Sequence, residues 1–234
     1  MLEVKKINTY YDDFKVLHDI SLKVKKGHFV SIIGPNGHGK STLLKTICGL
    51  IRPSSGHIIF NNKIVNGLPP NALVHKGITY VAEKRNLFSE MTVFENLKLG
   101  AYSVRSRKKE KENLEYVFEL FPKLKTRKNQ LASTLSGGEA RMLAIGRGLM
   151  SSAKLLAIDE PSLGLAPNLR VEVFNKIGEI NKMGITILLV EQTITEAAEY
   201  INKVYLLEDG RIMFEGKPKE ALSNKHIKKA FLGL

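Results

Sequence analysis

The sequence contains a single cysteine, no tryptophan and no long apolar run. One cysteine cannot build a disulfide framework, and Cys48 falls in an expected helix, where a small buried side chain is the ordinary interpretation. We therefore expect a reducing, cytosolic compartment. The longest apolar stretches, near residues 29–33 and 185–190, are much shorter than the roughly 20 residues of a membrane-spanning helix. If the protein works at a membrane, another chain must cross it.

Acidic residues are scarce beside basic ones, since 23 Asp and Glu against 36 Lys and Arg give a formal net charge of +13. Such an excess suits nucleic acid, anionic lipid headgroups or an acidic partner, and charge alone does not choose among them. The densest basic run, residues 105–111, contains no aromatic side chains that could stack on bases. We therefore expect no direct nucleic-acid partner. Residues 1–4 do not lead from a basic region into an apolar run, so no signal peptide is expected.

Short β-branched runs alternate with helical stretches along the chain. Near-continuous apolar strands of this kind predict a mostly parallel sheet that is covered on both faces. We expect these core strands at residues 29–33, 78–81, 155–158, 186–190 and 204–207. More exposed strands, which indicate an antiparallel flank, are expected at residues 2–8, 16–24 and 58–65, the last bent around Asn61 and Asn62.

The pattern becomes helical between about residues 91 and 150. Thr92 is suited to be an N-cap, and apolar residues recur at helical spacing through Leu114, Val117 and Phe121. A length of 234 residues fits one α/β domain with a smaller insert. We therefore predict a single domain, residues 1–234, with a helical subdomain inserted at approximately 91–150.

A glycine-rich segment follows the expected strand at 29–33 and opens an expected helix at 41–50, which is the setting of a P-loop. Glycines let backbone N–H groups close around phosphates, and the helix N-terminus adds a favourable dipole. Lys40 would reach the β- and γ-phosphates of ATP, and the Ser41 hydroxyl would bind Mg²⁺. The nucleotide-binding residues predicted here are Gly34, Pro35, Asn36, Gly37, His38, Gly39, Lys40, Ser41 and Thr42.

The expected strand at 155–158 delivers two adjacent carboxylates, Asp159 and Glu160, to its carboxyl edge, where α/β proteins bind ligands. Asp159 would hold Mg²⁺ through water, and Glu160 would polarise the water that attacks the γ-phosphate. A strand that ends in Asp-Glu is often only a strand end meeting solvent. Together with the P-loop, however, it predicts a P-loop NTPase core that hydrolyses ATP.

The segment Leu135-Ser136-Gly137-Gly138-Glu139 precedes an expected helix at 140–150 and resembles the signature motif of the ABC ATPases. Ser136 and the glycine backbone at a helix N-terminus form an anion site. The resemblance, which extends over essentially the whole chain, implies that two cassettes pack head to tail. Ser136, Gly137, Gly138 and Glu139 of one cassette would then meet the ATP that is held by the other.

Four further segments, 80–88, 91–97, 160–167 and 189–192, resemble the ATPases of branched-chain amino acid (LIV-type) importers. The related urea and short-chain amide importers share them. The resemblance implies a peripheral subunit on the cytoplasmic face of the cell membrane, bound to transmembrane permease subunits and to a second ABC cassette, identical or different. It also implies an extracytoplasmic solute-binding protein as an indirect partner. Tyr11 matches the aromatic residue that stacks on adenine, although an ordinary exposed strand tyrosine remains an alternative.

Three positions depart from most ABC ATPases, and the LIV-type branch commonly shares these departures. Glu83 stands for glutamine, Ala166 for aspartate and Gln192 for histidine. Glu83 would either coordinate Mg²⁺ indirectly or balance the two basic residues that follow it. The Gln192 amide can donate a hydrogen bond to the γ-phosphate but cannot carry imidazolium charge. Hydrolysis at this chain's own site is therefore expected to be weaker than the intact Glu160 suggests, and a companion cassette with histidine would make the two sites unequal.

Three other replacements have a plainer interpretation. His38 replaces a small residue in the P-loop, and we expect an exposed position whose backbone alone contacts phosphate. Ala140 and Arg141 replace the glutamines that often follow the signature motif. They are expected to alter packing on the helix and not the chemistry.

Two other classes of function remain as alternatives. A soluble ABC ATPase that acts on ribosomes or DNA would suit the basic charge, but such proteins typically carry two cassettes or a long coiled-coil insertion. A regulatory nucleotide sensor would suit Ala166 and Gln192. Intact Lys40, Asp159 and Glu160 argue against a sensor, which has no need of a positioned base.

Overall fold

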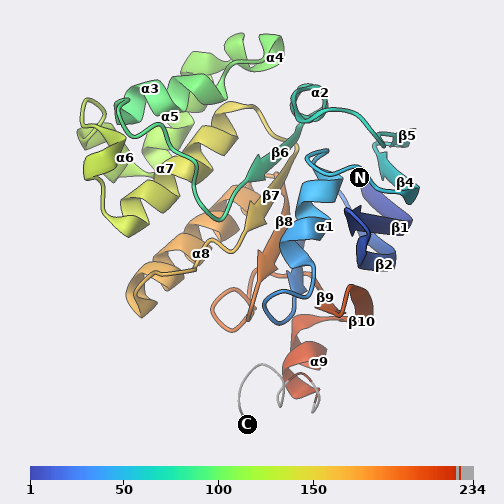
Figure 1. The fold of residues 1–234 in the computed structure, drawn as a ribbon. Helices are drawn as coiled ribbons and strands as arrows, with labels where there is room; N and C mark the ends of the chain where they lie inside the picture. The colour runs from blue at the N-terminus through green and yellow to red at the C-terminus, as the bar shows by residue number, and fades with distance from the viewer. Residues whose placement is uncertain (225–226, 228–234) are drawn as a thin grey trace.

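A six-stranded sheet lies at the centre of the molecule (Figure 1). The computed structural model describes residues 1–224 and 227. The strand order is β10-β9-β3-β8-β7-β6, and every pairing is parallel except that of β9 with β10. The strands are β3 (Phe29–Ile33), β6 (Ile78–Val81), β7 (Leu155–Asp159), β8 (Thr186–Glu191), β9 (Lys203–Glu208) and β10 (Arg211–Gly216).

The five core strands expected from the sequence are confirmed. Strands β3, β7 and β8 are buried along their whole length, as strands covered on both faces must be. Strand β10 was not expected. It is an edge strand whose residues alternate between exposed and half-buried, so it lacks the continuous apolar run that marks the others.

Alternate side chains of the central strands enter two separate cores. On β7, Leu156 and Ile158 pack into the core that contains α7 (Gly137–Met150) and α8 (Pro167–Lys182). Leu155 and Ala157 pack on the other side, with α1 (Lys40–Ile47) and the second sheet. The period of two in a strand therefore gives both faces of the sheet an apolar cover.

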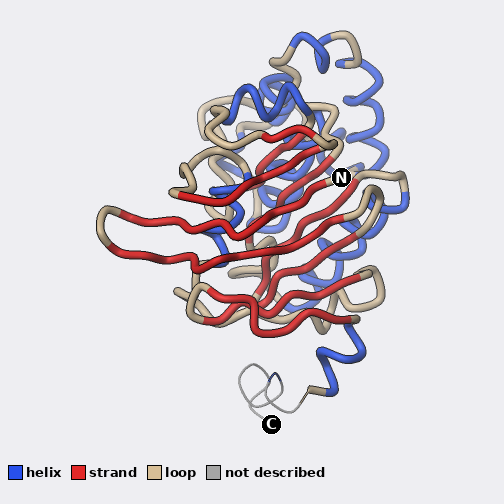
Figure 2. The backbone as a smooth tube through the Cα atoms, turned by 90° about the vertical axis from the view of Figure 1, so that its right-hand side faces the viewer, coloured by secondary structure: helices blue, strands red, loops and turns tan. Residues whose placement is uncertain are grey.

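The second sheet is antiparallel, with the order β2-β1-β4-β5, and confirms the predicted flank. Figure 2 shows the long strands of the molecule running side by side, with helices gathered above and behind them. The strands of this second sheet are β1 (Leu2–Tyr11), β2 (Phe14–Val24), β4 (Ser55–Phe60) and β5 (Lys63–Ile64).

The single bent strand predicted at 58–65 was wrong. The segment forms β4 and β5, two paired strands joined at Asn61 and Asn62, which have φ angles of 48° and 63°. Positive φ at both central residues is what a tight two-residue hairpin requires, and asparagine tolerates it well.

Most of the helices of residues 93–150 lie together beyond the β6 edge of the central sheet (Figure 1). Thr92 caps the first, as predicted: its hydroxyl accepts the Glu95 N–H at 3.2 Å, and the Glu95 carboxylate accepts the Thr92 N–H at 2.8 Å. The division into a core and a subdomain stays a prediction. These helices are α3 (Val93–Gly100), α4 (Val104–Arg107), α5 (Glu110–Leu120), α6 (Pro122–Thr126), the short 3₁₀ helix η1 (Ala132–Thr134) and α7.

Two helix boundaries differ from expectation. Helix α1 ends at Ile47, not at residue 50, because Gly49 follows with a left-handed φ of 74° and terminates it. Helix α7 begins at Gly137, not at residue 140, because Ser136 is its N-cap. The remaining helices are α2 (Pro70–Lys76) and α9 (Pro218–Ser223).

Candidate functional site

The predicted P-loop connects the carboxyl end of β3 to the N-terminus of α1. Its first residue, Gly34, approaches β9 so closely that an added Cβ would lie 2.1 Å from the carbonyl oxygen of Leu207. Gly39 is the N-cap of α1 with a φ of 97°, a left-handed conformation that favours glycine. No side chain caps α1, so its first N–H groups remain available to an anion.

Lys40 is only 3% exposed, and its ammonium turns back onto the loop. Its Nζ donates to the carbonyl oxygens of Gly34 at 2.9 Å and Pro35 at 3.0 Å, and lies 3.2 Å from Glu160 Oε1. A buried ammonium and a buried carboxylate offset each other's desolvation only while they remain paired. An incoming phosphate would offer Lys40 another anionic partner and release Glu160 from it.

Asp159, the last residue of β7, is 1% exposed and accepts hydrogen bonds from two neighbouring elements. The Ser41 hydroxyl donates to Oδ1 at 2.9 Å, and the Tyr80 hydroxyl, on β6, donates to Oδ2 at 2.7 Å. Burial raises the pKa of the Asp159 carboxyl above its ordinary value, while both hydroxyl donors act to lower it.

The donor set at Asp159 was tested against the predicted magnesium ion. Within the described residues, no group of three or more His, Cys, Asp or Glu side chains could hold a metal ion by itself. Mg²⁺ does not require one, because it commonly takes one or two protein oxygens and completes its shell with water and substrate phosphates. The carboxylate of Asp159 and the hydroxyl of Ser41, joined at 2.9 Å beside the P-loop, therefore fit this ion.

The two residues predicted to be catalytic lie in contact. Glu160 has a φ of 41°, an uncommon value for a non-glycine residue, and its N–H donates to the carbonyl oxygen of Val190 at 2.9 Å. Its Oε1 faces Lys40, and its Oε2 accepts a hydrogen bond from Gln192 Nε2 at 3.3 Å. The turn after β7 thus aims the Glu160 carboxylate at the P-loop and at Gln192.

Tyr11 and Glu83, both predicted site residues, make no hydrogen bond or ion pair with the P-loop in the described part of the chain. Tyr11 ends β1, is 46% exposed and pairs with Phe14 across the β1–β2 turn. Phe14, which the sequence analysis did not single out, lines a cavity of about 300 Å³ together with Asn36 and His38. Glu83 is half-buried in the loop after β6 and takes no part in the hydrogen bonds to Asp159.

The interpretation of His38 as an exposed position was wrong. The ring is half-buried, and its Nδ1 accepts the backbone N–H of Asp209 at 3.0 Å. The His38 carbonyl oxygen also accepts the Gly210 N–H at 3.2 Å. The His38 side chain therefore connects the P-loop to the turn between β9 and β10. Spacing in the sequence could not reveal this contact.

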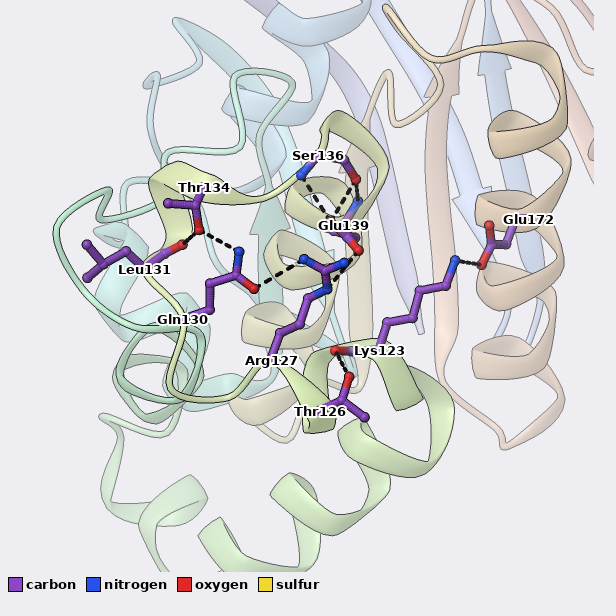
Figure 3. A network of polar contacts seen from close by, with 9 residues as sticks. All are labelled: Lys123, Thr126, Arg127, Gln130, Leu131, Thr134, Ser136, Glu139 and Glu172. Atoms are coloured by element: carbon purple, nitrogen blue, oxygen red, sulfur yellow. Dashed lines mark hydrogen bonds and ion pairs between the residues drawn. The ribbon is translucent and has the colours of Figure 1, made fainter.

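The signature motif forms the N-terminus of α7 and lies open to solvent at Ser136 and Gly137. Ser136 and Glu139 form a capping box: the Glu139 carboxylate accepts the Ser136 N–H at 3.0 Å, and the Ser136 hydroxyl accepts the Glu139 N–H at 3.4 Å. Figure 3 shows the Arg127 guanidinium beside Glu139, with Nε 3.1 Å from Oε1. Gly138 is buried against α8. No described hydrogen bond joins this motif to the P-loop of the same chain.

Arg141, expected to affect packing, is a buried cation with 1% exposure. Its Nη1 donates to the Ala82 carbonyl oxygen at 3.3 Å, which links α7 to the loop of Glu83. Burial lowers the pKa of Arg141 to about 10, so the guanidinium stays charged near neutral pH.

Sequence analysis missed two groups that the fold brings to this edge. Tyr80 reaches Asp159 because β6 pairs with β7 in parallel register. Glu191 ends β8 and lies 3% exposed, with its carboxylate between two loops. A signal existed for Glu191, since it stands at the carboxyl end of an apolar strand, as Asp159 does.

The comparisons with known proteins decide the family. The family model described as ABC transporter matches residues 17–163, a span that contains the P-loop, the signature motif, Asp159 and Glu160. The chain belongs to the ABC transporter family. Its fold and family make it an ATP-binding ATPase, as predicted.

Relatives within this family cover the chain from end to end. It is 44% identical over 233 residues, 100% of both chains, to the high-affinity branched-chain amino acid transport ATP-binding protein BraG of Pseudomonas aeruginosa. It is 37% identical to a probable branched-chain amino acid transport ATP-binding protein, LivF, of Archaeoglobus fulgidus, with 100% of this chain and 99% of the relative covered.

A solved structure supports the predicted fold class. The nucleotide-free ATP-binding cassette of an ABC transporter superposes with a TM-score of 0.87 at 31% identity, covering 100% of this chain and 99% of that one. The α/β core with an antiparallel flank is therefore that of an ABC ATPase cassette. Among the helices described, none combines the length and the apolar character needed to cross a bilayer.

Proposed function

We propose that this ABC ATPase powers the import of branched-chain amino acids, and that Lys40, Ser41, Asp159, Glu160 and Gln192 carry ATP binding and hydrolysis. Full-length similarity to ATPases named for branched-chain amino acid transport supports the substrate class. The observation that carries the chemistry is the convergence of Lys40, Glu160 and Gln192 within 3.3 Å contacts beside the P-loop.

The residues divide the work of hydrolysis between binding and proton transfer. The first N–H groups of α1 and the Lys40 ammonium bind the β- and γ-phosphates, because together they present donors and positive charge at one helix end. Once Lys40 turns to phosphate, the Glu160 carboxylate is free to orient the attacking water and accept its proton. The Gln192 amide, which is hydrogen-bonded to Glu160, would donate a hydrogen bond to the γ-phosphate.

Magnesium fits the same arrangement. Asp159 and Ser41 would hold Mg²⁺, with Glu83 as a further, indirect ligand, and the ion when bound would neutralise charge on the phosphates. Tyr80 keeps the Asp159 carboxylate oriented by its hydrogen bond at 2.7 Å.

The open signature motif supports action as a pair of cassettes. Ser136, Gly137, Gly138 and Glu139 present a capped helix N-terminus that has no P-loop contact within the chain, so they would close on ATP held by a second cassette. A dimeric bacterial ABC transporter cassette matches this chain with a TM-score of 0.77 at 28% identity. Tyr11, at the end of β1, would stack on adenine.

The cassettes would act on the cytoplasmic face of the cell membrane as peripheral subunits. Transmembrane permease subunits would convert closure of the cassette pair into alternating access, and an extracytoplasmic solute-binding protein would deliver the amino acid. The second cassette would be either an identical copy or a companion with histidine at the position of Gln192.

Uptake by intact cells of the source organism tests the substrate class. Deletion of the gene should abolish most of the high-affinity uptake of labelled leucine, and the wild-type gene, but not Glu160→Gln, should restore it, while urea uptake stays unchanged. Leucine uptake that persists after deletion, or loss of urea uptake instead, would contradict the proposed substrate.

A further inference from the structure

Glu191 is a buried carboxylate at the end of β8 that the proposed hydrolysis does not use. It is 3% exposed, and each of its oxygens accepts a backbone hydrogen bond from a different loop. Oε1 accepts the Ser162 N–H at 3.0 Å, and Oε2 accepts the Gln192 N–H at 3.2 Å.

These two loops carry the residues proposed to be catalytic. Ser162 lies two residues after Glu160, and the second donor is the backbone of Gln192 itself. The side chains of the two catalytic residues also meet directly, because Gln192 Nε2 donates to Glu160 Oε2 at 3.3 Å. A ring of contacts therefore runs from Glu160 through Ser162, Glu191 and Gln192 back to Glu160, and the Glu191 carboxylate closes it.

The surroundings make Glu191 costly to retain for packing alone. Within the described residues no hydrogen bond or ion pair joins Glu191 to a basic side chain, and burial raises the pKa of Glu191 to about 7. The Glu160 carboxylate adds repulsion, while the buried Arg141 on α7 supplies the opposite charge. An ionisable group that burial and a neighbouring charge perturb, and that contacts catalytic loops, is a candidate for a functional role.

We propose that Glu191 is a positioning residue that sets the placement of Glu160 against Gln192 by holding both loops. This inference rests on the proposed ATP hydrolysis. Glu191 touches neither water nor phosphate in the scheme and acts through Glu160. An ionised carboxylate accepts both N–H groups, whereas glutamine accepts one and turns its own N–H₂ donors toward the other.

The substitution Glu191→Gln tests this with little change in size. A matched control is Glu196→Gln, because Glu196 lines the same cavity of about 110 Å³ but pairs with Arg170 at 4.0 Å and not with either loop. The variants are made in the transporter complex purified through a tag on this chain, and ATP turnover is measured together with binding of a non-hydrolysable ATP analogue.

Displacement of the general base Glu160 slows the chemical step more than it weakens ATP binding. Glu191→Gln should therefore lower kcat by between about 10-fold and 100-fold. Binding of the analogue and KM for ATP should change less than about twofold, and Glu196→Gln should match the wild type in all three. In a Glu160→Gln background, where single-turnover hydrolysis is followed with labelled ATP, Glu191→Gln should cause no further loss.

The outcomes separate this inference from the function on which it rests. Wild-type turnover that Glu160→Gln removes, combined with an unchanged kcat in Glu191→Gln, would overturn the role of Glu191 alone. If Glu191→Gln lowered the single-turnover rate further in the Glu160→Gln background, the role of Glu191 would be overturned as well, because Glu191 would then act independently of Glu160. A complex that binds but never hydrolyses ATP would overturn both.

Discussion

The contact between Lys40 and Glu160 explains how the site stabilises two buried charges. The ammonium and the carboxylate lie 3.2 Å apart, and both side chains are less than 10% exposed. Each would otherwise bear an uncompensated desolvation cost of several kcal/mol. In the proposed mechanism, phosphate entry would exchange one anionic partner of Lys40 for another, so the Glu160 carboxylate would become available only when substrate is bound.

The raised pKa of Glu191 predicts a pH-dependent stability difference. Its folded-state pKa of about 7 exceeds the ordinary value of 4.5, so the stability that this group contributes is full below about pH 4.5 and is lost as the pH rises through about 7. Glu191→Gln does not titrate. Its melting temperature relative to the wild type should therefore rise between about pH 5 and about pH 8.

Thermal unfolding of both proteins across this pH interval measures the effect. Glu196→Gln, in which a more exposed carboxyl is replaced, provides the control for removal of a carboxylate from the same cavity. A melting-temperature difference between Glu191→Gln and the wild type that does not change with pH would contradict a raised pKa at Glu191.

At the scale of single residues, spacing in the sequence was enough for groups that are local in the chain. The P-loop, Asp159 and Glu160 could be predicted because each lies at the end of a recognisable strand. Tyr80 and Glu191 act across strands: the Tyr80 bond to Asp159 spans 79 residues, and it depends on the β6–β7 register. His38 likewise bonds Asp209, 171 residues away, which no local pattern encodes.

At the scale of elements, two of the described helices begin with a capping box formed by a hydroxyl residue and a glutamate, and they offer a matched comparison. Thr92 with Glu95 caps α3, and Ser136 with Glu139 caps α7. Replacing either cap by alanine should destabilise the protein by about 1 kcal/mol, because an N-terminal N–H loses its acceptor. Only Ser136→Ala should also lower ATP turnover, since only that helix end faces the nucleotide in the proposed pair.

Urea denaturation and ATP turnover of Thr92→Ala and Ser136→Ala give the two readouts. Equal effects of both variants on turnover would mean that loss of stability, not the signature motif, explains the change. Full turnover in Ser136→Ala would contradict a role of its hydroxyl in the pair.

The boundaries of helices and strands depend on hydrophobic periodicity, turn geometry and strand pairing, and only the first of these is plain in the sequence. Buried parallel strands have continuous apolar runs, so all five were predicted. The hairpin at Asn61 and Asn62 depends on two positive φ angles, and edge strand β10 depends on pairing with β9. Both were missed or misread because their signals, turn geometry and strand pairing, are weaker than hydrophobic periodicity.

At the scale of the whole molecule, the proposed chemistry is divided between the P-loop edge and the signature motif, and no hydrogen bond joins the two among the described residues. The P-loop, Asp159, Glu160 and Gln192 converge at the carboxyl edge of the central sheet, while Ser136 lies open at the start of α7. The sequence predicted both halves. Their completion by a second cassette follows from family resemblance and remains a proposal.

The central claim is that this chain hydrolyses ATP at a site organised around Glu160. ATP turnover of the transporter complex purified through a tag on this chain tests it most directly. It is measured for the wild type, for Glu160→Gln and for Glu172→Gln, a control on α8 that pairs with Lys123 at 3.9 Å. We predict that Glu160→Gln lowers turnover by about 10²- to 10⁴-fold, as loss of a general base does, while ATP binding and the control variant stay unchanged. Turnover that survives in Glu160→Gln would contradict the account.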